Sequence, residues 1–254
     1  MNEPIIKNRY LSVNWIGMAF IAVALVVGAS ILAGAYKYKF RKQETIRVTG
    51  SAGKDFSSDL IVWNGSYSRK AFDLKDAYAF IKKDEANVKS YLVSKGVKAE
   101  EMIFSSVKID KQFDTKYNEE GRFTGSVFTG YNLTQNIKVE SKDIPKVEGL
   151  AREITGLIET GIELNSPEPM YFYTRLSDLK LDLLDEAAAD ARKRADIIAN
   201  KTGGKIVGVA KANMGIFQIT GQNSNEDYSY GGAFNTSSKN KTASITVSLE
   251  CTVK

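Results

Sequence analysis

The sequence predicts an α+β protein: an N-terminal transmembrane helix, then a domain at residues 44–254 of mostly antiparallel sheet with about three helices. Three observations predict it. One uncharged apolar run near the N-terminus is long enough to cross a bilayer. Alternating strand patterns occupy much of the remaining chain, and three stretches carry apolar residues at helical spacing. Their order matches a split β-α-β arrangement, followed by a helix and two strands.

The expected anchor spans residues 11–36, between a tail at 1–10 and a basic linker at 37–43. No charge lies between Arg9 and Lys37, and about 20 helical residues cross a hydrocarbon core of about 30 Å. Aromatic rings near both ends favour the headgroup layer. The expected anchor residues are Trp15, Phe20, Leu25, Ile31 and Tyr36, and those expected at the lipid headgroups are Lys37, Lys39, Arg41 and Lys42.

A cleaved signal peptide is the alternative to this anchor, because Ala33-Gly34-Ala35 has the small-x-small pattern of a cleavage site. The apolar run exceeds the roughly 7–15 residues of a signal core, which favours an uncleaved anchor. Orientation is a separate question. Two basic residues precede the run and four follow it, so the positive-inside rule favours a cytoplasmic domain.

Composition limits the classes of function. From residue 43 onward, 29 basic residues balance 29 acidic ones, so the domain is neutral and no nucleic-acid partner is expected. The chain has no histidine, which excludes catalytic sites built on that residue. Cys251 is the single cysteine, so an internal disulfide and the usual zinc ligand sets are excluded. We expect no catalytic residue, cofactor or metal site, and no enzyme activity.

Two strands and a helix begin the domain. Residues 44–52 alternate and end in a glycine-containing stretch at 50–53, and residues 59–69 are rich in β-forming side chains. Asp73 is positioned to cap the first helix, and Gly96 follows its last apolar residue. A pair of strands therefore separates the basic linker at 37–43 from the first helix of the domain.

A long hairpin follows this helix. Residues 103–117 alternate, residues 118–121 have the composition of a turn, and a long strand is expected from 122 to 140. The second helix begins at Asp143 and ends at Gly161.

Residues 162–174 contain two prolines and then a strand pattern, and a division of the domain near residue 175 is an alternative to a single unit. Ser177 is expected to cap the third helix, an alanine-rich segment that ends at Gly203-Gly204. A strand at 205–219, a polar loop at 221–238 and a closing strand at 242–253 complete the chain.

An ordered set of motifs resembles the SIMPL-domain family of bacterial periplasmic or membrane-anchored proteins. The motifs include Thr49-Gly50-Ser51-Ala52-Gly53, Lys95-Gly96-Val97, Gly130-Tyr131-Asn132-Leu133 and the stretch Ala187–Gly208. The resemblance covers about residues 45–254. It implies an extracytoplasmic domain that self-associates, with links to envelope and oxidative-stress defence. It supplies no catalytic residues.

The resemblance favours a single-pass inner-membrane protein with a periplasmic domain, and the cytoplasmic orientation stays open. Membrane lipid and further copies of the chain are the expected partners. A binding or scaffold module that recruits a protein or an envelope polymer through loop 221–238 is the alternative function. The candidate interface residues are Phe113, Tyr117, Phe123 and Phe128 in the hairpin, with Tyr228, Tyr230 and Phe234 in the loop.

Overall fold

The computed structural model of the chain describes residues 15–39 and 44–254. Its first element is α1 (Trp15–Lys39), a helix of 25 residues that contains no acidic residue in its first turn and two lysines in its last. The uninterrupted apolar composition supports one continuous helix, because no proline or cluster of polar residues breaks it. The helix continues past Tyr36 to Lys39.

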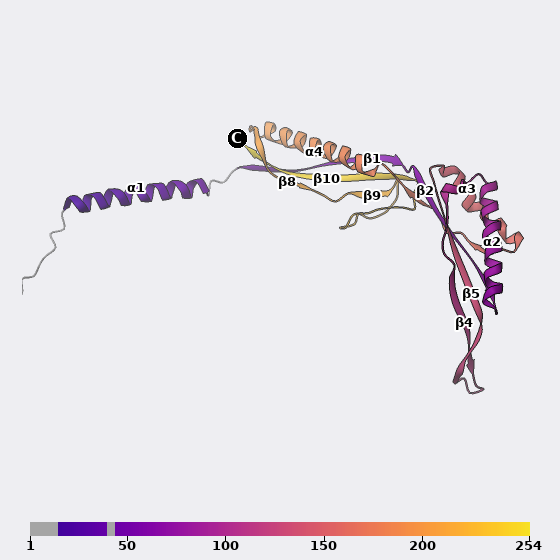
Figure 1. Cartoon of the computed structure of the whole chain (residues 1–254). Coiled ribbons are helices and arrows are strands. Elements are labelled where there is room, and N and C mark those ends of the chain that lie inside the picture. Colours follow the sequence, from indigo (N-terminus) through magenta and orange to yellow (C-terminus); the bar gives the residue numbers. More distant parts are fainter. Residues whose placement is uncertain (1–14, 40–43) are drawn as a thin grey trace, which may run out of the picture.

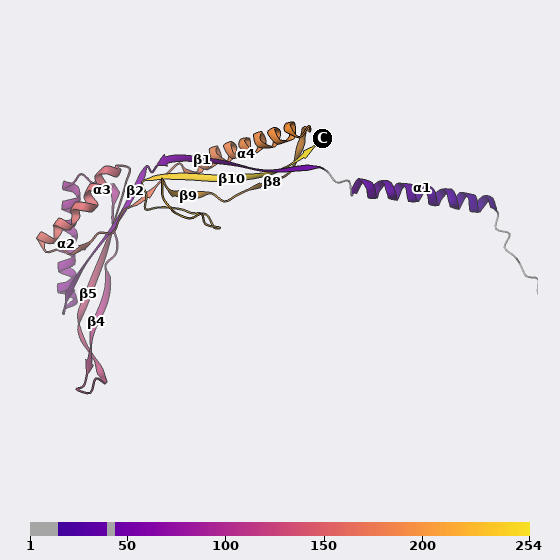
Figure 2. The same cartoon turned by 180° about the vertical axis from the view of Figure 1, so that it is seen from behind.

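The predicted α+β class is confirmed, since the rest of the chain forms two antiparallel sheets with helices packed on one face of each (Figures 1 and 2). In the first sheet, β10 (Asn240–Val253) pairs with β1 (Thr45–Ser57) on one side. On its other side it pairs with β8 (Ile206–Met214) and β9 (Gln218–Gly221). We call this the terminal-strand sheet, because it joins the first and last strands. The long helix α4 (Leu176–Lys201) covers one of its faces.

The second sheet, which we call the hairpin sheet, is built on β2 (Leu60–Ala71) and β5 (Phe123–Ser141). Along β5 lie β3 (Met102–Phe104) and β4 (Lys108–Tyr117), and along β2 lie β6 (Leu164–Asn165) and β7 (Met170–Phe172). Its helices are α2 (Leu74–Ser94), α3 (Ile144–Glu153) and the 3-10 segments η1 (Ala99–Glu101) and η2 (Ile154–Thr160). Figure 1 shows this sheet turned sharply away from the terminal-strand sheet.

The α4 helix packs on the terminal-strand sheet through a stripe of small residues. Ala187, Ala191 and Ala195 are fully buried. Gly50 of β1 lies directly beneath them: a Cβ at this position would lie 2.2 Å from the backbone nitrogen of Ala191. Because two heavy atoms that are not bonded to each other cannot lie this close, only glycine permits this close approach. Asp190 reinforces it by accepting a 2.9 Å hydrogen bond from the amide of Ser51.

The core of the hairpin sheet combines apolar packing with an ion pair whose carboxylate is buried. Trp63, Ile81 and Leu133 are fully buried between the sheet and its helices. Asp84 of α2 is 4% exposed and forms an ion pair with Arg69 of β2 through both carboxylate oxygens. Arg69 also donates a 2.7 Å hydrogen bond to the carbonyl oxygen of Gly161. Arg69 of β2 therefore holds α2 and the end of η2 against the sheet. Separating the ion pair would leave the buried carboxylate of Asp84 without a partner.

Several predicted boundaries differ from the structure. β1 runs through Gly50 and Gly53 to Ser57: both glycines pair with β10, and Gly50 serves close packing against α4 and not a turn. The 103–117 segment divides into β3 and β4 at Ser105, whose hydroxyl oxygen accepts the hydrogen bond of the Asn136 amide. The 205–219 segment likewise divides into β8 and β9.

The segments around the third helix also differ. Residues 162–174 form only the short strands β6 and β7, since Pro167 and Pro169 interrupt the pairing. The helix begins at Leu176, with Arg175 in the N-cap position and no side-chain cap, so the Ser177 cap was wrong. In contrast, Asp73 does cap α2, accepting hydrogen bonds from the amides of Lys75 and Asp76.

We expect Gly50→Ala to lower the free energy of unfolding by about 2 kcal/mol or more, because the added methyl group must displace the α4 backbone. Gly53→Ala is the matched control: it lies on the same strand, and its Cβ would meet the carbonyl oxygen of Ala243 at an ordinary 3.7 Å. Urea unfolding followed by circular dichroism measures both. Equal stability of the two variants would contradict the close-packing account.

Candidate functional site

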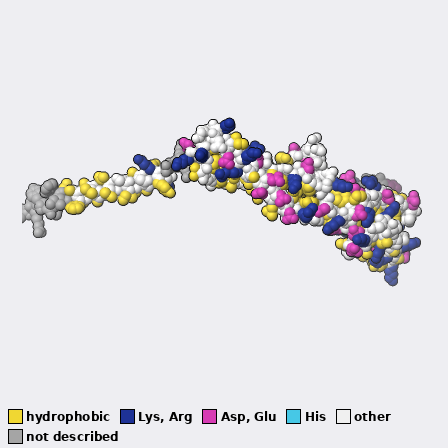
Figure 3. Space-filling view, turned by 90° about the horizontal axis from the view of Figure 1, so that it is seen from above, with side chains coloured by type: hydrophobic (Ala, Val, Ile, Leu, Met, Phe, Trp, Pro, Cys, Tyr) yellow, Lys and Arg dark blue, Asp and Glu magenta, His cyan; other side chains and the backbone are white. Residues whose placement is uncertain are grey.

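Three exposed surfaces are candidates for function, and the first is α1. One helix among the described residues, Gly17–Lys39, is long and apolar enough to cross a membrane, with a mean hydropathy of 2.4. Phe20, Leu25, Ile31 and Tyr36 are exposed along it. Figure 3 shows the hydrophobic side chains along the helix and basic ones at its domain end. Of the expected anchor and headgroup residues, Arg41, Lys42 and the side chain of Trp15 lie outside the described residues.

The second surface is the outer half of the β4–β5 hairpin, which projects beyond the end of α2 (Figure 1). The hairpin closes at Asn118, whose side-chain oxygen accepts hydrogen bonds from the amides of Glu120 and Arg122. Gly121 has a φ of 76°, a left-handed conformation that suits glycine in this turn. The turn is therefore well defined by local hydrogen bonds.

One face of this hairpin is aromatic. Phe128 makes edge-to-face contacts with Phe72, Phe113 and Tyr131, at centroid distances of 5.5, 5.6 and 5.1 Å. Tyr117 and Phe123 form a second pair nearer the tip, at 6.4 Å. We call these six residues the aromatic face. The face is continuous with the buried core, because cross-strand partners run from Tyr117 and Phe123 inward to Ile109 and the buried Leu133.

The aromatic face lacks a cover in the described part of the chain. Phe113, Tyr117 and Phe123 are 55%, 63% and 65% exposed, and Phe128 is half-buried. Phe72, 71% exposed, was not among the predicted interface residues. In the sequence, Phe72 stands directly before the Asp73 cap, so the local pattern indicates only the start of a helix. Its contact with the hairpin arises from the tertiary fold.

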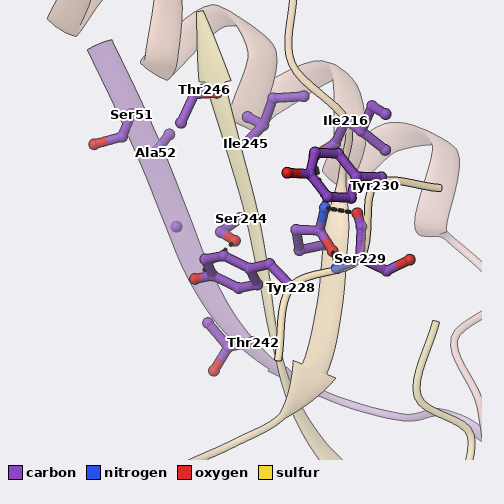
Figure 4. A pocket seen from close by; sticks show the side chains of 12 residues that line it. Ser51, Ala52, Ile216, Tyr228, Ser229, Tyr230, Thr242, Ser244, Ile245 and Thr246 are labelled. Carbon is purple, nitrogen blue, oxygen red and sulfur yellow. Dashed lines mark hydrogen bonds between the residues drawn. The ribbon is translucent and has the colours of Figure 1, made fainter. Parts of the chain in front are cut away.

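The third surface is the segment 222–239, which follows β9 and lies over the terminal-strand sheet. Tyr228 and Tyr230 reach the sheet face opposite α4, where they border a hollow of about 670 Å³ with Ser51, Ser244 and Thr246 (Figure 4). Phe234 lies apart from them: it lines a smaller hollow with Phe217 and Lys180. The structure therefore brings two of the three predicted loop residues together and separates the third.

Titratable groups inside the domain are engaged in structural contacts. Tyr67 donates a 2.8 Å hydrogen bond to Gln135, and burial raises the pKa of Tyr67. Gln135 in turn donates to Glu85, whose pKa is lowered by this bond and by Lys82 against the opposing effect of burial. Among the described residues, no group of three or more acidic or cysteine side chains is placed to hold a metal ion.

A buried lysine marks the junction of the two sheets. Lys241 is 2% exposed, and its Nζ donates a 2.6 Å hydrogen bond to the carbonyl oxygen of Tyr171. Burial lowers the pKa of Lys241 to about 8, partly offset by attraction to Glu226. Nearby, Asp59 accepts hydrogen bonds of 2.7 Å from both the amide and the hydroxyl of Thr174. These contacts tie together the two places where the chain passes between sheets.

Comparison with known proteins identifies the domain. A family model, SIMPL, described as a protein of unknown function (DUF541), matches residues 46–254. The chain belongs to the SIMPL family. The match covers both sheets of the domain and leaves α1 outside it. No curated protein matches the chain significantly.

The junction of this SIMPL domain generates a prediction about pH. Because the pKa of Lys241 is about 8 in the folded state against 10.5 ordinarily, the unfolded chain binds more protons between these values. Burying the charged form of Lys241 therefore lowers the free energy of unfolding by its full amount below pH 8. This destabilisation decreases as the pH rises toward 10.5. We expect Lys241→Met to gain stability relative to the wild type most at pH 7.

The stability advantage of Lys241→Met should shrink by about 1–3 kcal/mol between pH 7 and pH 10. Denaturant unfolding of both proteins at several pH values measures this difference, in which the titrations of all other residues cancel. If the difference in unfolding free energy between the two proteins did not change with pH, the pKa of Lys241 would not be lowered in the folded state.

Proposed function

We propose that this SIMPL protein is a membrane-anchored structural component of the cell envelope that assembles into homo-oligomers through the aromatic face of its hairpin. The observation that carries the proposal is an exposed aromatic face continuous with the hydrophobic core. An isolated two-stranded ribbon is marginally stable in water. A projecting arm with large exposed rings is therefore better explained by a partner that covers it.

Burial of the aromatic face in a contact between subunits would release enough free energy to support association. Burying one large apolar side chain contributes roughly 1.5–3 kcal/mol. Phe113, Tyr117 and Phe123 each retain more than half of their surface for such burial. Aromatic residues also lose few rotamers on binding, which makes them common anchors at interfaces.

The contact is expected to use the face of the hairpin and not its edge. Within residues 44–254, β4 pairs only with β5, so its other edge is open. Lys108, Lys111 and Lys116 lie along this strand. Lysines on an edge strand oppose backbone pairing with a neighbouring sheet. Ring packing between aromatic faces avoids this restriction.

Membrane attachment favours such an assembly. Only residues 40–44 separate the end of α1 from the start of β1, a span of at most about 20 Å. Anchored copies would thus share one plane and a common distance from the bilayer. This confinement raises their effective concentration and reduces the affinity that each contact needs.

We further propose that the domain lies on the extracytoplasmic side of the inner membrane and acts without catalysis. The resemblance of the motifs to periplasmic SIMPL proteins supports this location against the weak charge bias. A non-catalytic role is supported by the lack of histidine and by the hydrogen-bonded state of the buried Tyr67, Asp84 and Gln135.

We expect the detergent-solubilised protein to have a mass of several 28.0-kDa units, measured by light scattering with correction for detergent. The triple variant Phe113→Ser, Tyr117→Ser, Phe123→Ser should approach a single unit. The control is Phe80→Ser, which removes a similarly exposed ring, 50% exposed, from α2. A monomeric wild type, or a triple variant with unchanged mass, would refute assembly through this face.

Topology has its own test. Lys193 is exposed on α4, whereas the native Cys251 is fully buried. We expect Lys193→Cys to react with a membrane-impermeant maleimide in intact spheroplasts, and the wild type to remain unlabelled. Labelling that appears only after lysis would place the domain in the cytoplasm.

A further inference from the structure

The hollow beside segment 222–239 has a floor made by the terminal-strand sheet. The β10 side chains alternate: Ala243, Ile245 and Val247 are buried toward α4, and the residues between them face the opposite side. On that opposite side, Thr242, Ser244 and Thr246 form a row of hydroxyl groups, with Ser51 beside them on β1 (Figure 4). The hollow has a volume of about 670 Å³, within the range of small-molecule sites.

The wall of the hollow is held by a network around one glutamine. The side-chain oxygen of Gln218 accepts hydrogen bonds from the amides of Ser229 (3.1 Å) and Ala233 (2.8 Å). Its side-chain nitrogen donates a 2.9 Å bond to the carbonyl oxygen of Ser229. The loop tip is thereby bonded to β9 at both of its sides.

The base of the segment is held by a second network. Glu226 accepts hydrogen bonds from the amide of Gly221 (2.9 Å) and from the side-chain amide of Asn235. The Asn235 side-chain oxygen accepts a 2.8 Å bond from the amide of Ser238. Segment 222–239 is consequently an organised structure that places its side chains in defined positions.

This organised segment holds two tyrosine rings in solvent. Tyr228 is 71% exposed and Tyr230 is 98% exposed. The hydroxyl group of Tyr228 accepts a 3.5 Å hydrogen bond from Ser244 on the floor. Rings that stay in solvent add little hydrophobic stabilisation to the fold. Their position at the rim of a hollow indicates that a ligand covers them.

The chemistry of the lining identifies the class of ligand. None of the residues that line this hollow carries a charge, so a charged ligand would find no counter-charge there. In the described part of the chain, the hydroxyl groups of Ser51, Thr246 and Tyr230 form no hydrogen bond, and they remain free to donate and accept. Two isoleucines are among the lining residues: Ile216, which is exposed, and Ile245, whose side chain is buried in the core on the α4 side of the sheet.

We infer that this hollow binds a neutral oligosaccharide, such as a segment of an envelope glycan. A sugar ring has an apolar C–H face, which would stack on Tyr228 or Tyr230, and a rim of hydroxyl groups, which would pair with the serine and threonine row. This combination of exposed rings and free hydroxyl groups fits such a ligand better than an apolar peptide. The inference does not rest on assembly through the hairpin, which lies on the other sheet.

The test uses the full-length protein in lipid nanodiscs, because alkyl-glycoside detergents carry sugars that would compete. Fluorescently labelled protein is applied to an array of neutral and acidic oligosaccharides, and titration calorimetry measures the best neutral ligand. We expect binding to neutral glycans, at least fivefold weaker in Tyr228→Ala and in Tyr230→Ala. Tyr78→Ala, which removes an exposed tyrosine from α2, should bind as the wild type does.

A second variant distinguishes a sugar from an apolar ligand. Thr246→Val keeps the shape of the side chain and removes its hydroxyl group, so it should weaken a sugar several-fold and leave or strengthen an apolar ligand. The assembly-deficient hairpin variant should keep the affinity per site. Absence of binding to every neutral glycan, binding to acidic glycans alone, or full binding by the double variant Tyr228→Ala, Tyr230→Ala would overturn the inference.

Discussion

The close contact between α4 and β1 is the constraint on which the rest of the domain depends. Gly50 and the alanines above it allow the helix backbone to approach the strand so closely that no side chain fits between them. This contact fixes one face of the terminal-strand sheet. The opposite face carries the hydroxyl row of β10 and lies beneath segment 222–239. The small side chains of α4 thus determine which face of the sheet the helix occupies.

The same sheet also determines where the hairpin points. The chain leaves β1 and returns to α4 through two short segments, which Asp59 and Thr174 join by hydrogen bonds. Lys241 adds a bond from β10 to Tyr171 at the start of the second passage. These bonds connect the terminal-strand sheet to the hairpin sheet, which carries the aromatic face. The orientation of the hairpin relative to the terminal-strand sheet consequently depends on a few polar contacts at one junction.

Sequence reasoning located most elements because their signals are local. Apolar spacing identifies α2 and α4, alternation identifies β5 and β10, and the Asp73 cap depends on its immediate neighbours. The errors arose where the cause is distant in sequence. Gly50 and Gly53 have the composition of a strand end, and β1 continues through them because it pairs with β10, with Gly50 also packed closely under α4.

The candidate surfaces show the same limit. Exposed aromatic residues in the hairpin and loop could be found from composition, but their grouping could not. Phe72 joins Phe128 only in the folded sheet, and Phe234 turns away from the two tyrosines that precede it. The hydroxyl row needs the register of β1 against β10, which pairs residues roughly 200 positions apart. No local pattern carries that information.

The pairing of β1 with β10 also has a consequence for the order in which the chain is made. Thr45 pairs with Thr252, and Lys254 exchanges backbone hydrogen bonds with Lys205. β1 therefore has no partner until β10, roughly 200 residues later in the chain, has been synthesised and, on the proposed topology, has crossed the membrane. The hairpin sheet, whose strands are contiguous in sequence, can form earlier. A chain without β10 would leave the whole of β1 as an unpaired strand edge, which is prone to pair with other chains.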